Sequence, residues 1–107
     1  MRLQVKGRNI QVSPSLRAYA ESKLARLDKQ LAPDTAVDLE LGAETKHSGR
    51  TAEATVFTKG PTIRATESTS DIRAAIDQLV ANLERQLVRY REKRRQEPRR
   101  RTAHHGI

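Results

Sequence analysis

The sequence predicts an α+β fold, a two-layer sandwich in which a four-stranded sheet carries two helices on one face, in the order β-α-β-β-β-α. Three patterns indicate this order. Residues 14–31 have a helical period, residues 37–68 contain three segments that alternate apolar and polar residues, and a long helical pattern begins near residue 72. A chain of 107 residues is expected to form one domain.

The first two elements are predicted to be a strand and a helix. Residues 3–12 alternate apolar and polar types around a turn signal at 7–9, which suggests a bent or bulged strand. Ser13 can cap the following helix, Pro14 suits its first position, and Pro33 ends it. Its apolar residues recur at helical spacing: Leu16, Ala20, Leu24, Leu27 and Leu31.

Three strands in a meander are expected next. They cover residues 36–43, 51–58 and 62–68, and turn residues at 48–49 and 59–61 separate them. Alternation places Val37, Leu39, Leu41, Ala43, Ala52, Ala54, Val56, Ile63 and Ala65 on the inner face. The other face is polar and expected to be open to water: Asp38, Glu40, Glu53, Thr55, Phe57 and Arg64.

Ser70 or Asp71 is predicted to cap a second, long helix. Arg94 falls on its apolar stripe, so by that point we expect the helix to have passed the edge of the sheet. Residues 97–107 lack periodicity after Pro98 and are expected to be a basic, disordered tail, which leaves a domain over residues 1–96. The stripe consists of Ile72, Ile76, Leu79, Val80, Leu83, Leu87 and Tyr90.

The net charge of +8 is concentrated near the C-terminus. Residues 85–101 hold nine Lys and Arg against two Glu, whereas residues 1–84 hold twelve basic against eleven acidic residues. A cluster of this kind is the electrostatic footprint of a polyanion-binding protein, and a solvated tail is the alternative.

Several other functions are disfavoured. The chain has no cysteine, which excludes disulfides and thiol chemistry and suits a reducing, cytoplasmic location. His47, His104 and His105 lack further ligands, so no metal site is expected. Without a glycine-rich phosphate loop or a nucleophile-base pair we expect no cofactor, small-molecule substrate or enzymatic activity. No apolar run is long enough to span a membrane.

Basic residues are sorted onto particular flanks of the two helices. Arg85, Arg89 and Lys93 follow i, i+4, i+8 spacing and form a basic stripe roughly opposite the apolar one. Arg91 and Arg95 widen this basic stripe on one flank. On the first helix the basic flank consists of Lys23, Arg26 and Lys29. With three aromatic residues the chain has no stacking platform, so recognition of RNA is expected to use the backbone and its shape.

Residues 71–95, DIRAAIDQLVANLERQLVRYREKRR, resemble the second helix of the ribosome hibernation-promoting factors. That helix typically reads Asp-x-x-Ala-Ala-Ile-Asp-x-x-x-x-x-Leu-x-x-Gln-Leu. The resemblance extends to LQVKGRNIQVSPSLRAYAESKLARLDK near the N-terminus and to RTAEATVF and TIRATESTSD in the middle of the chain, and it covers residues 1–96. The matching helix positions are Asp71, Ala74, Ala75, Ile76, Asp77, Leu83, Gln86 and Leu87.

The resemblance implies the β-α-β-β-β-α fold, which is similar to double-stranded-RNA-binding domains. It also implies that residues 1–96 bind the small ribosomal subunit in the decoding channel, block the mRNA and tRNA sites, and repress translation in stationary phase or stress. The contacts would run from basic helix residues to ribosomal RNA. In this chain the candidates are Lys23, Arg26, Lys29, Arg85, Arg89, Arg91, Lys93 and Arg94.

Two further expectations concern the C-terminal segment and the alternatives. Residues 97–107 look like the first part of the linker of long family members, and ribosome dimerisation is implied only if a C-terminal domain follows. A general module for double-stranded or structured RNA is one alternative function. A protein-interaction module that uses the open sheet face or an edge strand is another.

Overall fold

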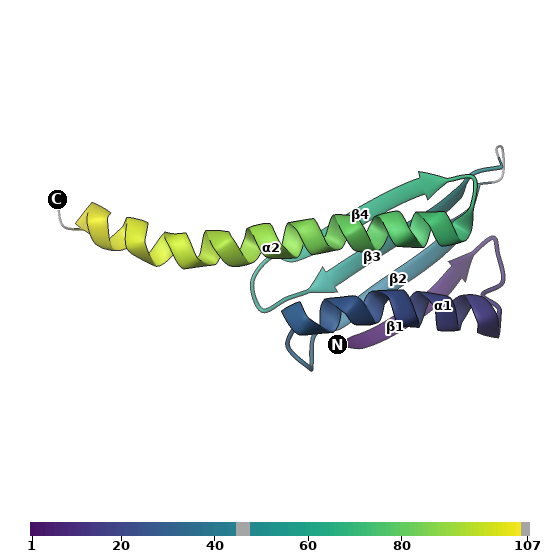
Figure 1. The fold of residues 1–107 in the computed structure, drawn as a ribbon, viewed down its shortest axis with the longest axis horizontal. Coiled ribbons are helices and arrows are strands. Elements are labelled where there is room, and N and C mark those ends of the chain that lie inside the picture. Colours follow the sequence, from purple (N-terminus) through teal and green to yellow (C-terminus); the bar gives the residue numbers. More distant parts are fainter. Residues whose placement is uncertain (45–47, 106–107) are drawn as a thin grey trace.

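The computed structural model describes residues 1–44 and 48–105, and describes residues 94–105 by their backbone alone. Its element order confirms the predicted β-α-β-β-β-α fold, with a short 3₁₀ helix added after the first helix (Figure 1). The elements are β1 (Arg2–Arg8), α1 (Pro14–Leu24), η1 (Ala25–Gln30), β2 (Ala36–Ala43), β3 (Arg50–Phe57), β4 (Thr62–Thr69) and α2 (Ile72–His105).

The strands form one sheet in the order β1-β2-β3-β4. β1 is parallel to β2, because α1 and η1 carry the chain back to the starting edge, and the other neighbours are antiparallel. The register aligns Val5 with Leu39, Leu39 with Ala54, and Ala54 with Ala65, and all four side chains are buried. One apolar row therefore crosses the whole sheet.

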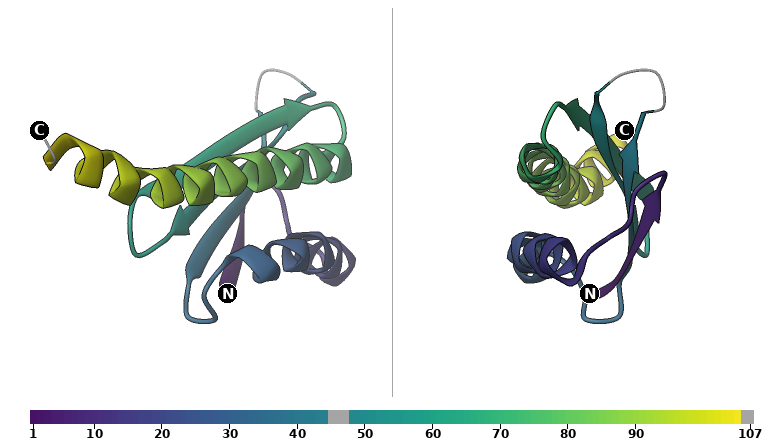
Figure 2. Two further views of the ribbon diagram at one scale, coloured as in Figure 1. Left: turned by 60° about the vertical axis from the view of Figure 1, so that its left-hand side comes forward. Right: turned by 90° about the vertical axis from the view of Figure 1, so that its right-hand side faces the viewer.

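Both helices cover the same face of this sheet (Figure 2). The helices contribute Leu16, Ala20, Leu24, Leu27, Ala75, Ile76, Leu79, Val80, Leu83 and Leu87 to the buried core. The opposite face carries polar residues and Phe57, which is 46% exposed. This division of the two faces agrees with the one predicted from strand alternation.

The first helix begins as expected but changes character. Ser13 Oγ accepts a hydrogen bond from the Leu16 backbone N–H at 3.1 Å, which makes Ser13 the N-cap. After Leu24 the chain tightens into η1 rather than continuing as an α-helix. Residues three apart lie on the same side of a 3₁₀ helix, so Leu27 stays directed at the core below Leu24.

The first strand is shorter than predicted. β1 ends at Arg8, and Asn9 has a positive φ of 62°, which takes the chain out of the extended region. Ile10 and Val12 are therefore not strand residues, although they pack against the core. Gly7 permits this reversal, because a Cβ there would lie 2.4 Å from the carbonyl oxygen of Ile10.

The second helix begins at Ile72, and the preceding Asp71 caps it, because Asp71 Oδ1 accepts a hydrogen bond from the Arg73 backbone N–H at 3.1 Å. Its C-terminal part extends past the sheet, as predicted (Figure 1). It also continues through Pro98 to His105, where an irregular tail was expected. The segment is rich in Arg, Glu and Gln, which have high helix propensity. The division into a domain over 1–96 and a tail over 97–107 stays a prediction.

Candidate nucleic-acid interface

The predicted basic stripe on α2 faces solvent. Leu83 and Leu87 are buried against the sheet, and Arg85, Arg89 and Lys93 are exposed on the outward side of the same turns. Among residues with described side chains, none pairs with these three cations through an ion pair or hydrogen bond. Their charges are therefore not neutralised within the described structure.

Two more predicted cations are exposed on other parts of the helical layer. Lys29 lies on η1 and Arg91 on α2, and neither has an ion pair among the described residues. Arg91 is two positions from Arg89, which is about 200° around the helix, so it faces the end of the sandwich rather than the stripe. The side chain of Arg94 lies outside the described residues, as does His47.

Lys23 and Arg26 are held differently from the other candidates. Lys23 Nζ lies 3.8 Å from Asp77 Oδ1, and an Arg26 guanidinium nitrogen lies 3.4 Å from Glu84 Oε1. Both acidic partners are on α2, so these pairs join the two helices. The Lys23 and Arg26 side chains remain 38% and 63% exposed, and pairs this exposed contribute at most about 1 kcal/mol, so a phosphate can compete for them.

A polar cluster that the sequence did not reveal joins the beginning of α2 to α1. Tyr19 Oη donates a hydrogen bond to Asp77 Oδ1 at 2.7 Å. The Arg73 guanidinium lies 4.7 Å from the centre of the Tyr19 ring and donates to Ser15 Oγ at 3.0 Å. The Asp77 hydrogen bond is the main reason that the pKa of Tyr19 is raised above its usual value. Tyr19 therefore links the two helices, and this link depends on tertiary structure.

A groove of about 400 Å³ runs between η1 and α2 at the base of the basic stripe. Arg85 and Arg89 line it together with Glu84 and Glu92, so its charge is mixed. Gln30 closes it on the η1 side, and Val88 provides its apolar part. A phosphate backbone lying on this surface would meet the arginine side chains first at the outer rim, where they are exposed.

Two other kinds of feature are absent from the described part of the chain. Among the described residues, no group of three His, Cys, Asp or Glu side chains is close enough to hold a metal ion. Within the same part of the chain, no helix has the length and apolar character required to cross a membrane.

A two-layer α+β domain that presents unneutralised cations along one helical surface belongs to the class of small domains suited to polyanions. Within that class, the chain belongs to the family described as sigma 54 modulation protein / S30EA ribosomal protein, whose model matches residues 3–95. This match confirms the family resemblance found in the sequence.

Known relatives share both sequence and fold. A ribosome hibernation promotion factor from Picosynechococcus sp. is 37% identical over 87% of this chain and 50% of the relative. A ribosome hibernation promoting factor from Escherichia coli K12 is 31% identical over 90% of this chain and 99% of the relative. The crystal structure of the Thermus thermophilus Protein Y N-terminal domain superposes with a TM-score of 0.75 and 34% identity, over 84% and 99% of the chains. The chain thus spans about half of the first relative and nearly all of the second.

Proposed function

We propose that this chain is a ribosome hibernation factor that binds the small ribosomal subunit and represses translation. The names of its relatives support this role. The observation that carries the proposal is a set of five exposed cations on the helical layer, none of which has a carboxylate partner among the described residues. These are Lys29, Arg85, Arg89, Arg91 and Lys93.

The proposed mechanism is occlusion in the cytoplasm during stationary phase or stress. The domain sits in the decoding channel, where its volume excludes mRNA and tRNA, and no covalent bond is made or broken. Exposed guanidinium groups bind ribosomal RNA phosphates in pairs of parallel hydrogen bonds and release counterions. The two-layer sandwich supplies the shape, because both helices bury apolar side chains in one core with the sheet and the Tyr19 cluster joins the helices to each other.

The salt dependence of binding tests this mechanism. If the five cations each neutralise one phosphate, log affinity for the small subunit should fall against log salt with a slope of roughly −4. Sedimentation of small subunits with added protein at several salt concentrations measures this slope. A nearly flat response would contradict phosphate binding, and equal affinity for an isolated RNA duplex would favour the general RNA-binding alternative.

Charge reversal identifies the binding surface. Replacing Arg85→Glu together with Arg89→Glu should weaken subunit binding at least tenfold and reduce the salt slope by about 1.5 to 2. The control is Arg2→Glu with Lys6→Glu, which makes the same charge change on the exposed β1. Melting curves establish that both variants are folded. Equal loss of binding in both variants would show that net charge, rather than this helical surface, sets the affinity.

A further inference from the structure

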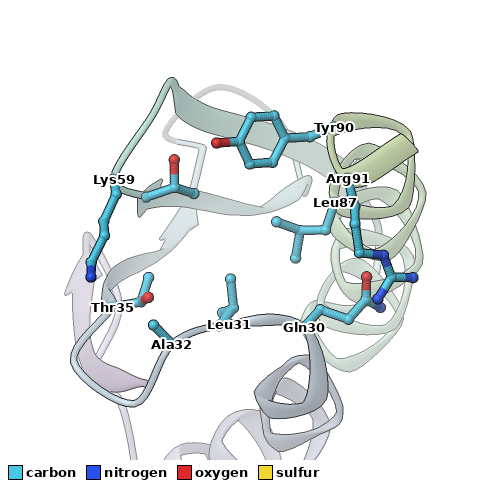
Figure 3. A pocket seen from close by; sticks show the side chains of 9 residues that line it. Gln30, Leu31, Ala32, Thr35, Lys59, Leu87, Tyr90 and Arg91 are labelled. Carbon is cyan, nitrogen blue, oxygen red and sulfur yellow. The ribbon is translucent and has the colours of Figure 1, made fainter. Parts of the chain in front are cut away.

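A second pocket lies at one end of the sandwich, and the basic stripe of Arg85, Arg89 and Lys93 does not line it. It has a volume of about 450 Å³, within the roughly 300–1,000 Å³ typical of small-ligand sites. It opens where the end of η1, the β3–β4 turn and α2 meet (Figure 3). Its lining consists of Gln30, Leu31, Ala32, Thr35, Thr58, Lys59, Leu87, Tyr90 and Arg91.

The lining combines an apolar floor with a cationic rim. Leu31, Ala32 and Leu87 provide aliphatic surface, and Tyr90 adds an aromatic ring. Lys59 and Arg91 lie on opposite sides of the opening, and none of the described lining residues is acidic (Figure 3). A ligand that suits this arrangement has a flat, largely apolar part and an anionic group beside it, which is the chemistry of a nucleotide.

One buried polar atom in the lining also lacks a partner. Gln30 Oε1 is shielded from solvent and accepts no hydrogen bond from any described residue. Buried acceptors are normally satisfied, and one that is not needs an explanation. Gln30 lies at the boundary between this pocket and the groove beside Arg85 and Arg89. Rotation of its amide towards the pocket would let it accept a hydrogen bond from the exocyclic amine of a base.

We propose that this pocket binds one unpaired nucleotide of the RNA held by the helical layer, an inference that rests on the proposed function. The base lies against Leu31, Leu87 and the Tyr90 ring, and Arg91 and Lys59 hold the adjoining phosphates. Gln30 lines both this pocket and the groove beside Arg85 and Arg89, so a strand bound in that groove can reach the pocket past Gln30. Phosphate contacts would fix how the RNA strand is aligned on the helical layer. The pocket would then accept a nucleotide only where that RNA is single-stranded.

Filling the pocket tests the proposal without changing any charge. Ala32 is an exposed residue of the apolar lining, and Ala32→Phe places a ring where the base would lie. We expect this variant to bind small subunits roughly tenfold more weakly than the unmodified protein, as for the loss of one stacked base, with the salt slope unchanged. The matched control is Ala18→Phe, which adds the same ring to the exposed side of α1, outside the pocket.

Chemical probing of bases in the bound subunit gives a second readout. The unmodified protein and Ala18→Phe should protect one unpaired base that Ala32→Phe leaves reactive, and all three should protect the same backbone positions. If Ala32→Phe binds as tightly as Ala18→Phe, or protects the same bases, the pocket does not hold a nucleotide. This outcome would leave the proposed function intact, whereas failure of the unmodified protein to bind subunits would contradict the proposed function itself.

Lys59→Ala provides an independent variant in case Ala32→Phe is unstable. Lys59 is exposed on the β3–β4 turn, across the pocket from α2, so its loss should weaken subunit binding more than Lys6→Ala on β1 does. Equal effects of the two substitutions would overturn the proposal.

Titration of the protein with AMP, CMP, GMP and UMP distinguishes a nucleotide within RNA from a free nucleotide as the ligand. We expect weak binding, and tight saturable binding would assign the pocket to a free nucleotide instead.

Discussion

Asp77 shows how one residue can serve a structural purpose that its position in a motif does not reveal. Its Oδ1 accepts from Tyr19 and lies 3.8 Å from Lys23 Nζ, and both partners are on the other helix. The sequence places Asp77 in the family pattern and Lys23 on a basic flank. It does not show that the two meet, because residues 54 positions apart come together only when the helices pack on the sheet.

The Asp77 hydrogen bond leads to a prediction about titration. Asp77→Asn should lower the pKa of Tyr19 towards its usual value of about 10, since the carboxylate is the first cause of the raised pKa. The pKa of Tyr19 is measured from the absorbance of tyrosinate near 295 nm as the pH is raised. A Tyr90→Phe background leaves Tyr19 as the one tyrosine that absorbs. Because folding raises this pKa, its contribution to stability is present below pH 10 and is lost as the pH rises through the folded value. Asp34→Asn, in the η1–β2 loop, should leave the titration unchanged.

Gly7 and Gly49 give a contrasting pair of glycine substitutions. At Gly7 an added Cβ would meet a backbone carbonyl at 2.4 Å, so Gly7→Ala should destabilise the fold by about 1–3 kcal/mol. At Gly49 the nearest atom is in the Glu44 side chain at 3.7 Å, an ordinary contact, and Gly49→Ala should change stability by less than about 1 kcal/mol. Urea unfolding of both variants measures the difference, and equal effects would contradict the close approach at Gly7.

At the scale of elements, the long helix α2 depends on the side chains that it buries against the sheet. Leu83 is fully buried, so Leu83→Ala should cost about 2–5 kcal/mol of unfolding free energy. Gln78 is exposed on the same helix, and Gln78→Ala should change stability by less than about 0.5 kcal/mol. Denaturant titrations followed by circular dichroism compare the two. Similar losses would mean that α2 is stabilised mainly by its own propensity rather than by packing.

The order of elements could be predicted because each has a strong period, whereas some boundaries depend on tertiary contacts. Alternation in β2, β3 and β4 identified the buried side chains except at the end of β2, where Gly42 is buried and Ala43 is only half-buried. The sequence did not show that β1 stops at Arg8, because Ile10 and Val12 have the same apolar character in a strand or in a packed loop. The tightening into η1 was missed since Leu24 and Leu27 suit both helix types.

At the scale of the whole molecule, the candidate site combines features that sequence reveals with features that it cannot. The outward direction of Arg85, Arg89 and Lys93 follows from helical spacing and is present in the structure. The pairing of Arg26 with Glu84 depends on how the two helices cross. The pocket at the end of the sandwich was missed for a similar reason, because three separate segments build it. RNA contact by all eight predicted residues stays a prediction.

The parallel pairing of β1 with β2 has a consequence for the order in which the chain assembles. Short turns join β2, β3 and β4, but Arg2 reaches its partner Ala36 only after α1 and η1 have crossed the sheet. Closing that longer loop costs more chain entropy, so β1 should join last, although it is the first strand to be synthesised. Native-state hydrogen exchange should accordingly show faster exchange at the amides of β1 than at those of the central strand β3. Equal protection of β1 and β3 would indicate that the sheet forms as one cooperative unit.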